Sequence, residues 1–244
     1  MHHFICNICG TEGDSEHLDR ERSSCATCGS NVRYRWIVHA LSTGLFGQSL
    51  PLQEMPVRKD IRGIGLSDPQ LLADAFSVPF AYENTFYHTE PRLDIMTAAG
   101  EAEYDFIVSS EVFEHVNSPV QTAFNNLARL LKPGGVAIFT VPWGFQPETI
   151  EHFPSLHDWQ LVELRSGWVL LNRTADGQLE TFEKLVFHGG PGSTLEMRLF
   201  SHAALMAHFR TAGFAEITMA EEVPAWGIVE LPWSRGFLLR KAAA

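Results

Sequence analysis

The chain has 244 residues, 45% of them hydrophobic and 19% charged, a composition typical of a globular protein with one main domain and appendages. Its formal net charge of -11 at pH 7 argues against an extended phosphate-binding surface, because such surfaces are basic. No apolar run is long enough to cross a membrane, and the N-terminus lacks the basic and apolar regions of a signal peptide, so we expect a cytoplasmic protein.

The first 30 residues contain all four cysteines of the chain, Cys6, Cys9, Cys25 and Cys28. Their spacing, C-x2-C-x15-C-x2-C, is typical of a tetrahedral zinc site in a cytosolic chain. Four thiolates leave no open position for water or substrate, so we expect a structural Zn2+ knuckle over residues 1–30. The alternative is a redox-active or disulfide-bonded pair in each C-x2-C.

A helix is predicted from Asn31 to about Gly44, with Ser30 as its N-cap. Its apolar residues recur at helical spacing and would form one face. Arg33 and Arg35 lie near its start. They would meet either a ligand carboxylate or phosphate or, as we favour, solvent and acidic side chains.

Residues 61–69, IRGIGLSDP, have the pattern of a strand, a turn and the start of a helix. Ser67 or Asp68 would cap a helix that begins at Pro69. Gly63 and Gly65 by themselves are a weak signal, because a tight turn without a ligand needs the same residues. A second strand is predicted over Phe80–Phe86.

The stretch from Tyr104 to Trp143 carries the strongest pattern in the chain. A short apolar run at residues 106–109 predicts a buried strand, and Ser118–Pro119 predicts the start of an amphipathic helix. Lys132–Gly135 would end that helix, and the near-continuous apolar run over residues 136–141 suits a parallel strand that is covered on both faces. This order predicts a right-handed βαβ unit.

At these residues the chain resembles class I S-adenosylmethionine-dependent methyltransferases. The likeness rests on SSEVFEHV at residues 109–116, directly after a strand, and on LLKPGG at residues 130–135. It implies an α/β fold: a doubly wound, Rossmann-like, seven-stranded methyltransferase sheet. Here the zinc knuckle precedes this sheet and a β-rich insertion interrupts it. We therefore divide the chain into a knuckle, residues 1–30, and a methyltransferase-like domain, residues 31–244, with a substrate-side insertion over residues 144–200.

The resemblance also implies where S-adenosyl-L-methionine binds. The turn after the first strand would face the cofactor, although Ser67 stands where a glycine is usual and no acid precedes the loop. Glu83 would approach the ribose, with Asn84 or Thr85 as substitutes. Asp94 would accept from the adenine amino group unless it caps a following turn. The implied cofactor-binding residues are Gly63, Gly65, Ser67, Asp68, Glu83, Asp94, Ile95, Met96, Ser110, Glu111 and His115.

The insertion contains two strand-like runs on either side of Ala175–Gly177, a hairpin signal, and a further strand over Thr194–Leu199. We expect it to cover the carboxyl edge of the sheet. An unperturbed imidazole changes charge near neutral pH, so each histidine of the insertion is a candidate base. We rank His157 and His152 above His188 as catalytic residues, because neighbouring carboxylates would orient their rings.

After the insertion, Ser201 would cap a helix that ends near Gly213. Two strands, over Glu216–Ala220 and Gly236–Arg240, would follow it. The resemblance implies that the second of these strands runs antiparallel to the rest of the sheet.

Together these features predict methyl transfer from S-adenosyl-L-methionine to an O or N atom of a small-molecule or sugar acceptor. An RNA methyltransferase is a further alternative, but the acidic balance and the absence of a basic run beside the cysteines argue against nucleic acid as a partner. A non-catalytic scaffold with the same fold is the alternative from another functional class, because the glycine loop is degraded.

Overall fold

A six-stranded sheet forms the centre of this computed structural model, which describes residues 1–188, 190, 192 and 194–243. The strand order is β15–β16–β6–β5–β3–β4, and β16 is antiparallel to both of its neighbours, as predicted. The bounds are β3 Arg58–Leu66, β4 Phe80–Thr85, β5 Tyr104–Ser110, β6 Leu131–Thr140, β15 Phe214–Met219 and β16 Phe237–Lys241.

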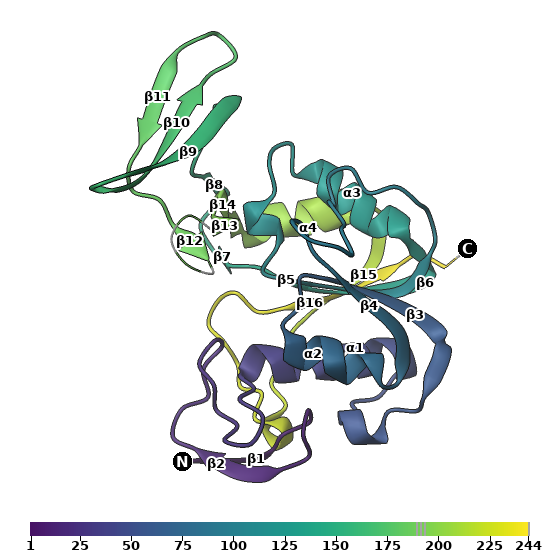
Figure 1. Cartoon of the computed structure of the whole chain (residues 1–244). Coiled ribbons are helices and arrows are strands. Elements are labelled where there is room, and N and C mark those ends of the chain that lie inside the picture. The colour runs from purple at the N-terminus through teal and green to yellow at the C-terminus, as the bar shows by residue number, and fades with distance from the viewer. Residues whose placement is uncertain (189, 191, 193, 244) are drawn as a thin grey trace.

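Helices cover both faces of this sheet (Figure 1). On one face lie α1 (Val32–Phe46) and α2 (Gln70–Ser77), and on the other α3 (Gln121–Leu130) and α4 (His202–Thr211). Each face has its own apolar core. Phe106 and Trp36 belong to the core on the α1 side, and Phe124 and Phe209 to the core on the α3 side. The α/β, doubly wound class is therefore confirmed.

The described sheet has six strands where we expected seven. The segment between β4 and β5 forms turns instead of a strand, and contributes only an isolated bridge between Phe86 and Arg92. Within this segment Asp94 closes a turn: its Oδ1 accepts the Met96 N–H at 2.9 Å and its carbonyl accepts the Thr97 N–H at 3.1 Å.

Three predicted boundaries also shift. Asn31, not Ser30, caps α1, because its side chain accepts the Tyr34 N–H. α3 begins at Gln121, after the predicted Ser118–Pro119 start. The predicted turn at Lys132–Gly135 lies inside β6, whose first residue already pairs with Tyr104.

The N-terminal residues form a hairpin of β1 (His2–Ile5) and β2 (Glu12–Ser15), whose connecting loop carries Cys6 and Cys9, and a later loop carries Cys25 and Cys28. This region packs against the sheet domain, because Phe4 and Ile8 share a core with Trp36 and Ile228. Short 3-10 turns η1 (Leu52–Glu54) and η3 (Pro224–Trp226) complete this side of the molecule.

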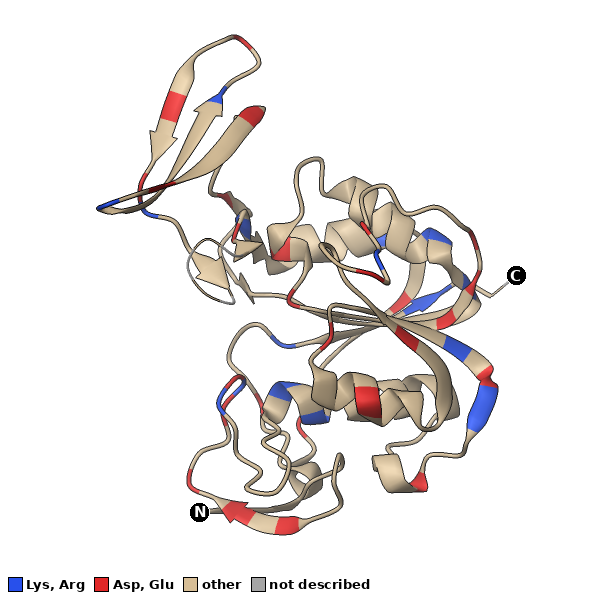
Figure 2. Cartoon of the chain, in the orientation of Figure 1, with Lys and Arg blue, Asp and Glu red and all other residues tan. Residues whose placement is uncertain are grey.

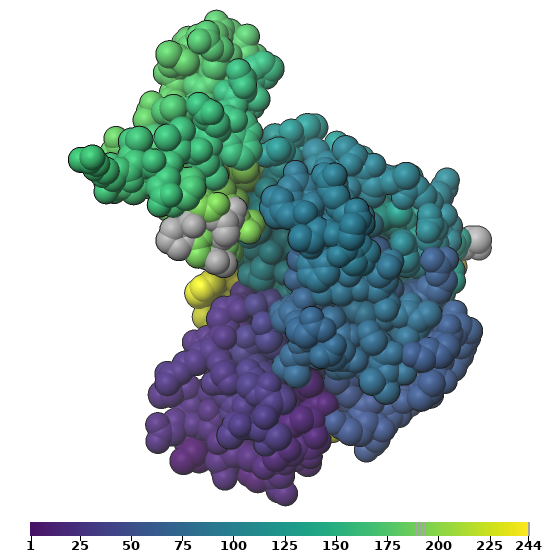
Figure 3. All heavy atoms as spheres, viewed as in Figure 1, coloured from purple at the N-terminus to yellow at the C-terminus, as the bar shows by residue number. Residues whose placement is uncertain are grey.

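The insertion has two parts. One is a three-stranded sheet of β9 (Asp158–Leu164), β10 (Gly167–Arg173) and β11 (Leu179–Phe182), which includes the predicted hairpin and stands out from the body of the molecule as a lobe (Figure 3). The other part stays at the main sheet and consists of short strands, β7 Trp143–Gly144, β8 Ile150–Glu151, β12 Phe187–His188, β13 Thr194–Leu195 and β14 Arg198–Ser201. In this second part, β14 contacts the 3-10 turn η2 (Phe113–His115) that follows β5.

Candidate functional site

Parallel strands β3, β5 and β6 end at one edge of the sheet, the position at which doubly wound folds bind ligands. Polar residues follow each strand there: Ser67 after β3, Glu111 after β5, and Thr140 at the end of β6. The Glu111 N–H donates to the Thr140 carbonyl at 2.9 Å, which fixes the turn after β5 to its neighbour.

The turn after β3 keeps part of the expected geometry. Ser67 has a positive φ of 60°, a conformation that favours glycine, and it is exposed. The predicted cap by Ser67 or Asp68 is wrong: Pro69 holds the N-cap position of α2, and among the described residues no side chain caps this helix. Its first N–H groups are therefore suited to an anion such as a carboxylate.

Gly63 and Gly65 lie within β3, and packing requires their small size. A Cβ on Gly63 would lie 2.0 Å from the Phe106 ring, and one on Gly65 would lie 1.9 Å from the Tyr82 hydroxyl. These glycines therefore admit aromatic side chains on the α2 side of the sheet. Their predicted role toward the cofactor stays a prediction.

Asp68 is buried beside this turn. It accepts a hydrogen bond from the Tyr82 hydroxyl, and its backbone N–H and carbonyl both bond to the Asn84 side chain at 2.9 Å. Burial raises the pKa of Asp68 to about 7, against a lowering effect of the Tyr82 hydrogen bond. Asn84, at the end of β4, therefore contacts the loop, whereas Glu83 is exposed in the middle of the strand.

The predicted adenine-binding segment is a turn, as described above. Asp94 is half-buried and caps that turn, Ile95 is buried in the core, and Met96 packs against the core from a partly buried position. The structure thus bears out the alternative reading of Asp94 as a turn cap, which leaves its role toward adenine as a prediction.

A charged bridge joins the cysteine-bearing region to the sheet edge. Arg20 donates to both carboxylate oxygens of Glu111, at 3.0 and 2.5 Å. Arg33 pairs with Glu21 and donates to the Ser110 hydroxyl. Burial disfavours the charged form of Glu111, but the hydrogen bond and charge of Arg20 outweigh it and lower the pKa of Glu111. The interpretation as a solvated or salt-bridged residue is confirmed for Arg33 but is wrong for Arg35, which is fully buried and donates to the Ser24 hydroxyl and the Gly227 carbonyl.

A second polar cluster, referred to below as the Glu–His cluster, combines two residues of the turn after β5 with three residues of the insertion. Its members are Glu114, His115, His152, His188 and Glu196. The Glu114 side chain is fully buried, and in the described part of the chain neither of its oxygens has a hydrogen-bond partner. Burial, followed by the nearby charge of Glu111, raises the pKa of Glu114 well above its usual range. Burial also lowers the pKa of His115, while the hydrogen bond to Glu196 raises that of His188.

The insertion contributes His152, His188 and Glu196 to this cluster. Glu196 lies 3.0 Å from His188 Nε2 and 3.1 Å from His152 Nε2. The structure does not bring His157 into it: that side chain is exposed before β9, and its backbone N–H donates to Asn172. The ranking of His157 above His188 does not match this geometry. Glu196 was not singled out because no sequence pattern marks it.

A cavity of about 430 Å³ adjoins the cluster. His152 and Glu196 form one side of it, and residues around β11 form the other, among them Phe182 and Lys184. Its walls are partly polar and partly aromatic, which suits a small molecule with hydroxyl groups.

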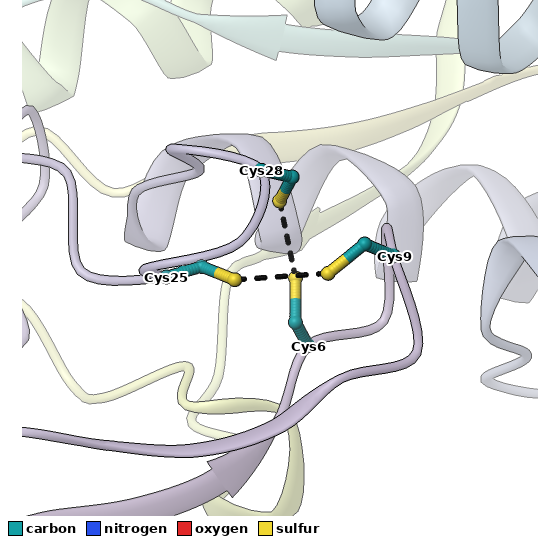
Figure 4. Close-up of side chains that lie close together, drawn as sticks. All are labelled: Cys6, Cys9, Cys25 and Cys28. Atoms are coloured by element: carbon teal, nitrogen blue, oxygen red, sulfur yellow. Dashed lines mark hydrogen bonds between the residues drawn. The ribbon is translucent and has the colours of Figure 1, made fainter.

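The four cysteine side chains converge on one point (Figure 4). Their sulfur atoms all lie within 4.8 Å of one another, and the Cys6–Cys28 and Cys9–Cys25 sulfur separations are both 3.7 Å. Zn–S bonds of about 2.3 Å in a tetrahedron place the sulfurs about 3.8 Å apart. The Gly10 and Gly29 N–H groups donate to the Cys6 and Cys25 carbonyls, which closes both knuckle turns. The donor set therefore fits zinc.

A family model described as a methyltransferase domain matches residues 9–181, most of the chain. No curated protein gives a significant match. Within the described ranges, no helix has both the length and the apolar character that a membrane crossing requires.

Several solved structures are similar in part. CalS10, an amino pentose methyltransferase from Micromonospora echinaspora, is 16% identical with a TM-score of 0.47, over 86% of this chain and 94% of that one. DesVI from Streptomyces venezuelae is 14% identical with a TM-score of 0.44, over 85% and 92%. The 1,6-didemethyltoxoflavin-N1-methyltransferase of Burkholderia thailandensis is 12% identical with a TM-score of 0.44, over 94% and 100%.

Proposed function

Since the chain belongs to the methyltransferase-domain family, we propose that it transfers a methyl group from S-adenosyl-L-methionine to an O or N atom of a small-molecule or sugar acceptor. The observation that carries this proposal is the polar edge of the sheet. There the turn after β3, the turn after β5 and the insertion each contribute polar side chains within a fold of the matching family.

The cofactor would lie along this edge. The uncapped N-terminus of α2 and the exposed Ser67 suit its carboxylate, and Ser110 and Glu111 lie at the next strand end. We assign the ribose side to Glu83 and the adenine side to Asp94, Ile95 and Met96. Gly63, Gly65 and Asp68 would act indirectly, because they shape the turn. His115 would line the site next to Glu111.

The chemistry supplied by the bound cofactor is a methyl group on a sulfonium, which leaves as a thioether when the new O–C or N–C bond forms. The protein's task is to hold the acceptor in line with that group and to accept a proton when the acceptor must lose one. His152 is the candidate base that faces the cavity beside Glu196. His157 stays a weaker candidate on the exposed side of the insertion.

The acceptor class follows from charge. The chain carries a formal net charge of -11, and Figure 2 shows Lys and Arg dispersed among Asp and Glu along the visible elements. A protein that binds along the phosphate backbone of RNA needs a continuous basic surface. The charge distribution therefore favours a small molecule or sugar over RNA as the acceptor. The cavity beside the Glu–His cluster has a matching size and polarity.

Zinc forms a separate part of the proposal. Cys6, Cys9, Cys25 and Cys28 would hold one Zn2+ with no open position, so its role would be structural. The loop between the two cysteine pairs carries Arg20, which contacts Glu111 at the sheet edge. Zinc binding would therefore also position a charged residue of the active site.

Methyl-labelled S-adenosylmethionine tests the proposal. Zinc-loaded protein is incubated with it and with separate pools of sugars and other small molecules, RNA, and protein. We expect label in the small-molecule pool, and excess S-adenosylhomocysteine should suppress it. Label in RNA would overturn the acceptor class. Folded protein that binds cofactor yet labels none of the pools would favour the scaffold alternative.

A further inference from the structure

The Glu–His cluster contains three side chains whose donor atoms converge. A carboxylate oxygen of Glu114 and one ring nitrogen each of His115 and His188 lie within 4.8 Å of one another. His115 Nε2 is 3.6 Å and His188 Nδ1 is 3.8 Å from Glu114 Oε1. These separations are too long for hydrogen bonds but close to those of ligands that share a cation, since bonds of about 2.1 Å hold ligand atoms about 3.0 to 3.4 Å apart.

Both histidines are oriented as metal ligands usually are. The outer ring nitrogen of His115, Nδ1, lies 2.8 Å from the Leu195 carbonyl, an acceptor only, so Nδ1 carries the proton and Nε2 presents its lone pair toward Glu114. His188 bonds through Nε2 to the Glu196 carboxylate at 3.0 Å, and its Nδ1 lies on the side of the ring that faces Glu114, 3.8 Å from Oε1. A second acceptor that holds the outer N–H and fixes the tautomer is the common arrangement around bound metals.

Glu114 supplies an independent observation. Its side chain is fully buried, and no described residue gives either of its oxygens a hydrogen bond. A buried carboxyl without partners is costly, and proteins tolerate one chiefly where a ligand completes it. Its nearest polar neighbours within the cluster are the two imidazole nitrogens described above.

The backbone around these ligands is fixed. The Met197 N–H donates to the Glu114 carbonyl at 2.7 Å. Arg198, which is buried, donates to the Phe113 and Val116 carbonyls at 3.1 and 2.5 Å, and to Glu151 at 2.8 Å. The insertion is therefore attached directly to the turn that carries Glu114 and His115.

We propose that Glu114, His115 and His188 bind a divalent metal cation at the carboxyl edge of the sheet. Two imidazoles and one carboxylate are a ligand set suited to Zn2+, Fe2+ or Mn2+. Three protein ligands leave coordination positions open, unlike the four-cysteine site. The cavity lined by His152 and Glu196 is connected to this group through Glu196, whose carboxylate bonds to His188.

The cation would orient the acceptor and make a bound hydroxyl easier to deprotonate. The role of the cation toward the acceptor rests on the proposed function, whereas cation binding itself does not. The acceptor class then narrows to molecules with an oxygen donor beside the methylated atom, such as a sugar diol or a hydroxy acid.

The test titrates Mn2+ into protein whose cysteine site is already filled with Zn2+, and follows free Mn2+ by electron paramagnetic resonance. Thiolates prefer Zn2+, so Mn2+ reports on the oxygen and nitrogen ligands. We expect one saturable Mn2+ site per chain. Glu114→Gln and His188→Gln should each weaken it by well over tenfold, and Glu196→Gln by about tenfold, as expected for a residue that orients a ligand.

Matched controls are Glu101→Gln and His88→Gln, which remove an exposed carboxylate and an exposed imidazole elsewhere and should leave Mn2+ affinity unchanged. Should Glu114→Gln fail to fold, Glu196→Gln still tests the site. No saturable binding of Mn2+, together with no second equivalent of Zn2+ by calorimetry, would overturn the proposal, as would equal Mn2+ affinity in all variants. Titration of the same samples with S-adenosylhomocysteine separates the two ideas, because metal binding without cofactor binding would remove only the methyl-transfer function.

Discussion

The four-cysteine site and the Glu–His cluster are both groups of metal-ligating side chains, but they are built in opposite ways. The cysteines come from two short turns in one N-terminal segment, and they surround a point completely (Figure 4). The Glu–His cluster joins the turn after β5 to β12 of the insertion, and it adjoins a cavity. On our proposals the first site would therefore serve folding and the second ligand binding.

The largest effect should come from the cysteine site. Cys25→Ser should give insoluble or protease-sensitive protein, because structural zinc contributes about 10 to 16 kcal/mol to the folding of such small modules. Wild-type protein should contain about one zinc per chain by elemental analysis.

Thr27→Ala, in the same turn but exposed, serves as the control and should behave as wild type in limited proteolysis. A stable, metal-free wild-type protein would contradict the structural role.

The next largest effect on stability should come from breaking the contacts between the insertion and the turn after β5. Arg198→Met should lower the free energy of unfolding by about 3 kcal/mol, because it removes a charged donor from the buried Phe113 and Val116 carbonyls and leaves Glu151 without its partner. Urea denaturation measures this change. Arg210→Met, at an exposed position on α4, should change it by less than about 0.5 kcal/mol. Equal effects of the two substitutions would mean that Arg198 does not fix the cluster.

For the Glu–His cluster, we expect the stability of the protein to depend on added metal, and to change little when the Glu114 carboxylate is removed without metal present. Glu114→Gln should change stability without added metal by no more than about 1 kcal/mol, since the carboxyl has no partner to lose. At 100 times the dissociation constant, Mn2+ should stabilise the wild type by about 2.7 kcal/mol and leave the variant unchanged. Thermal unfolding with and without Mn2+ gives both numbers, and equal stabilisation of both proteins would contradict a site at Glu114.

Asp68 should give a smaller, pH-dependent effect. Its pKa of about 7 lies above that of an unfolded aspartate, so the folded chain binds the proton more tightly. The resulting stability is complete below about pH 4 and is lost as the pH rises through 7. Asp68→Asn removes this dependence, so its stability relative to wild type should improve by at most about 1.4 kcal/mol per pH unit between pH 5 and 7.

Urea denaturation across this range, with the exposed Asp74→Asn as the control, tests the assignment. A difference between Asp68→Asn and wild type that stays constant with pH would show that Asp68 titrates normally.

The contrast between a site built from one segment and a site built from distant segments also explains which features could be predicted from the sequence. Local patterns identified the cysteine cluster and the central βαβ unit, because each depends on neighbouring residues. The antiparallel direction of the final strand was implied by the resemblance to the methyltransferase family, and so was the seventh strand, which the described sheet lacks. Glu114 and His115 were visible as a pair, but Glu196 and the orientation of His188 depend on how the insertion folds back onto η2.

The central claim is that the polar edge of this sheet binds S-adenosylmethionine. Calorimetric titration of zinc-loaded protein with S-adenosylmethionine, and with S-adenosylhomocysteine, tests it most directly. We predict one site per chain with micromolar affinity for at least one of the two. The absence of binding by folded, zinc-loaded protein would contradict the account and would identify the chain as a methyltransferase-like scaffold.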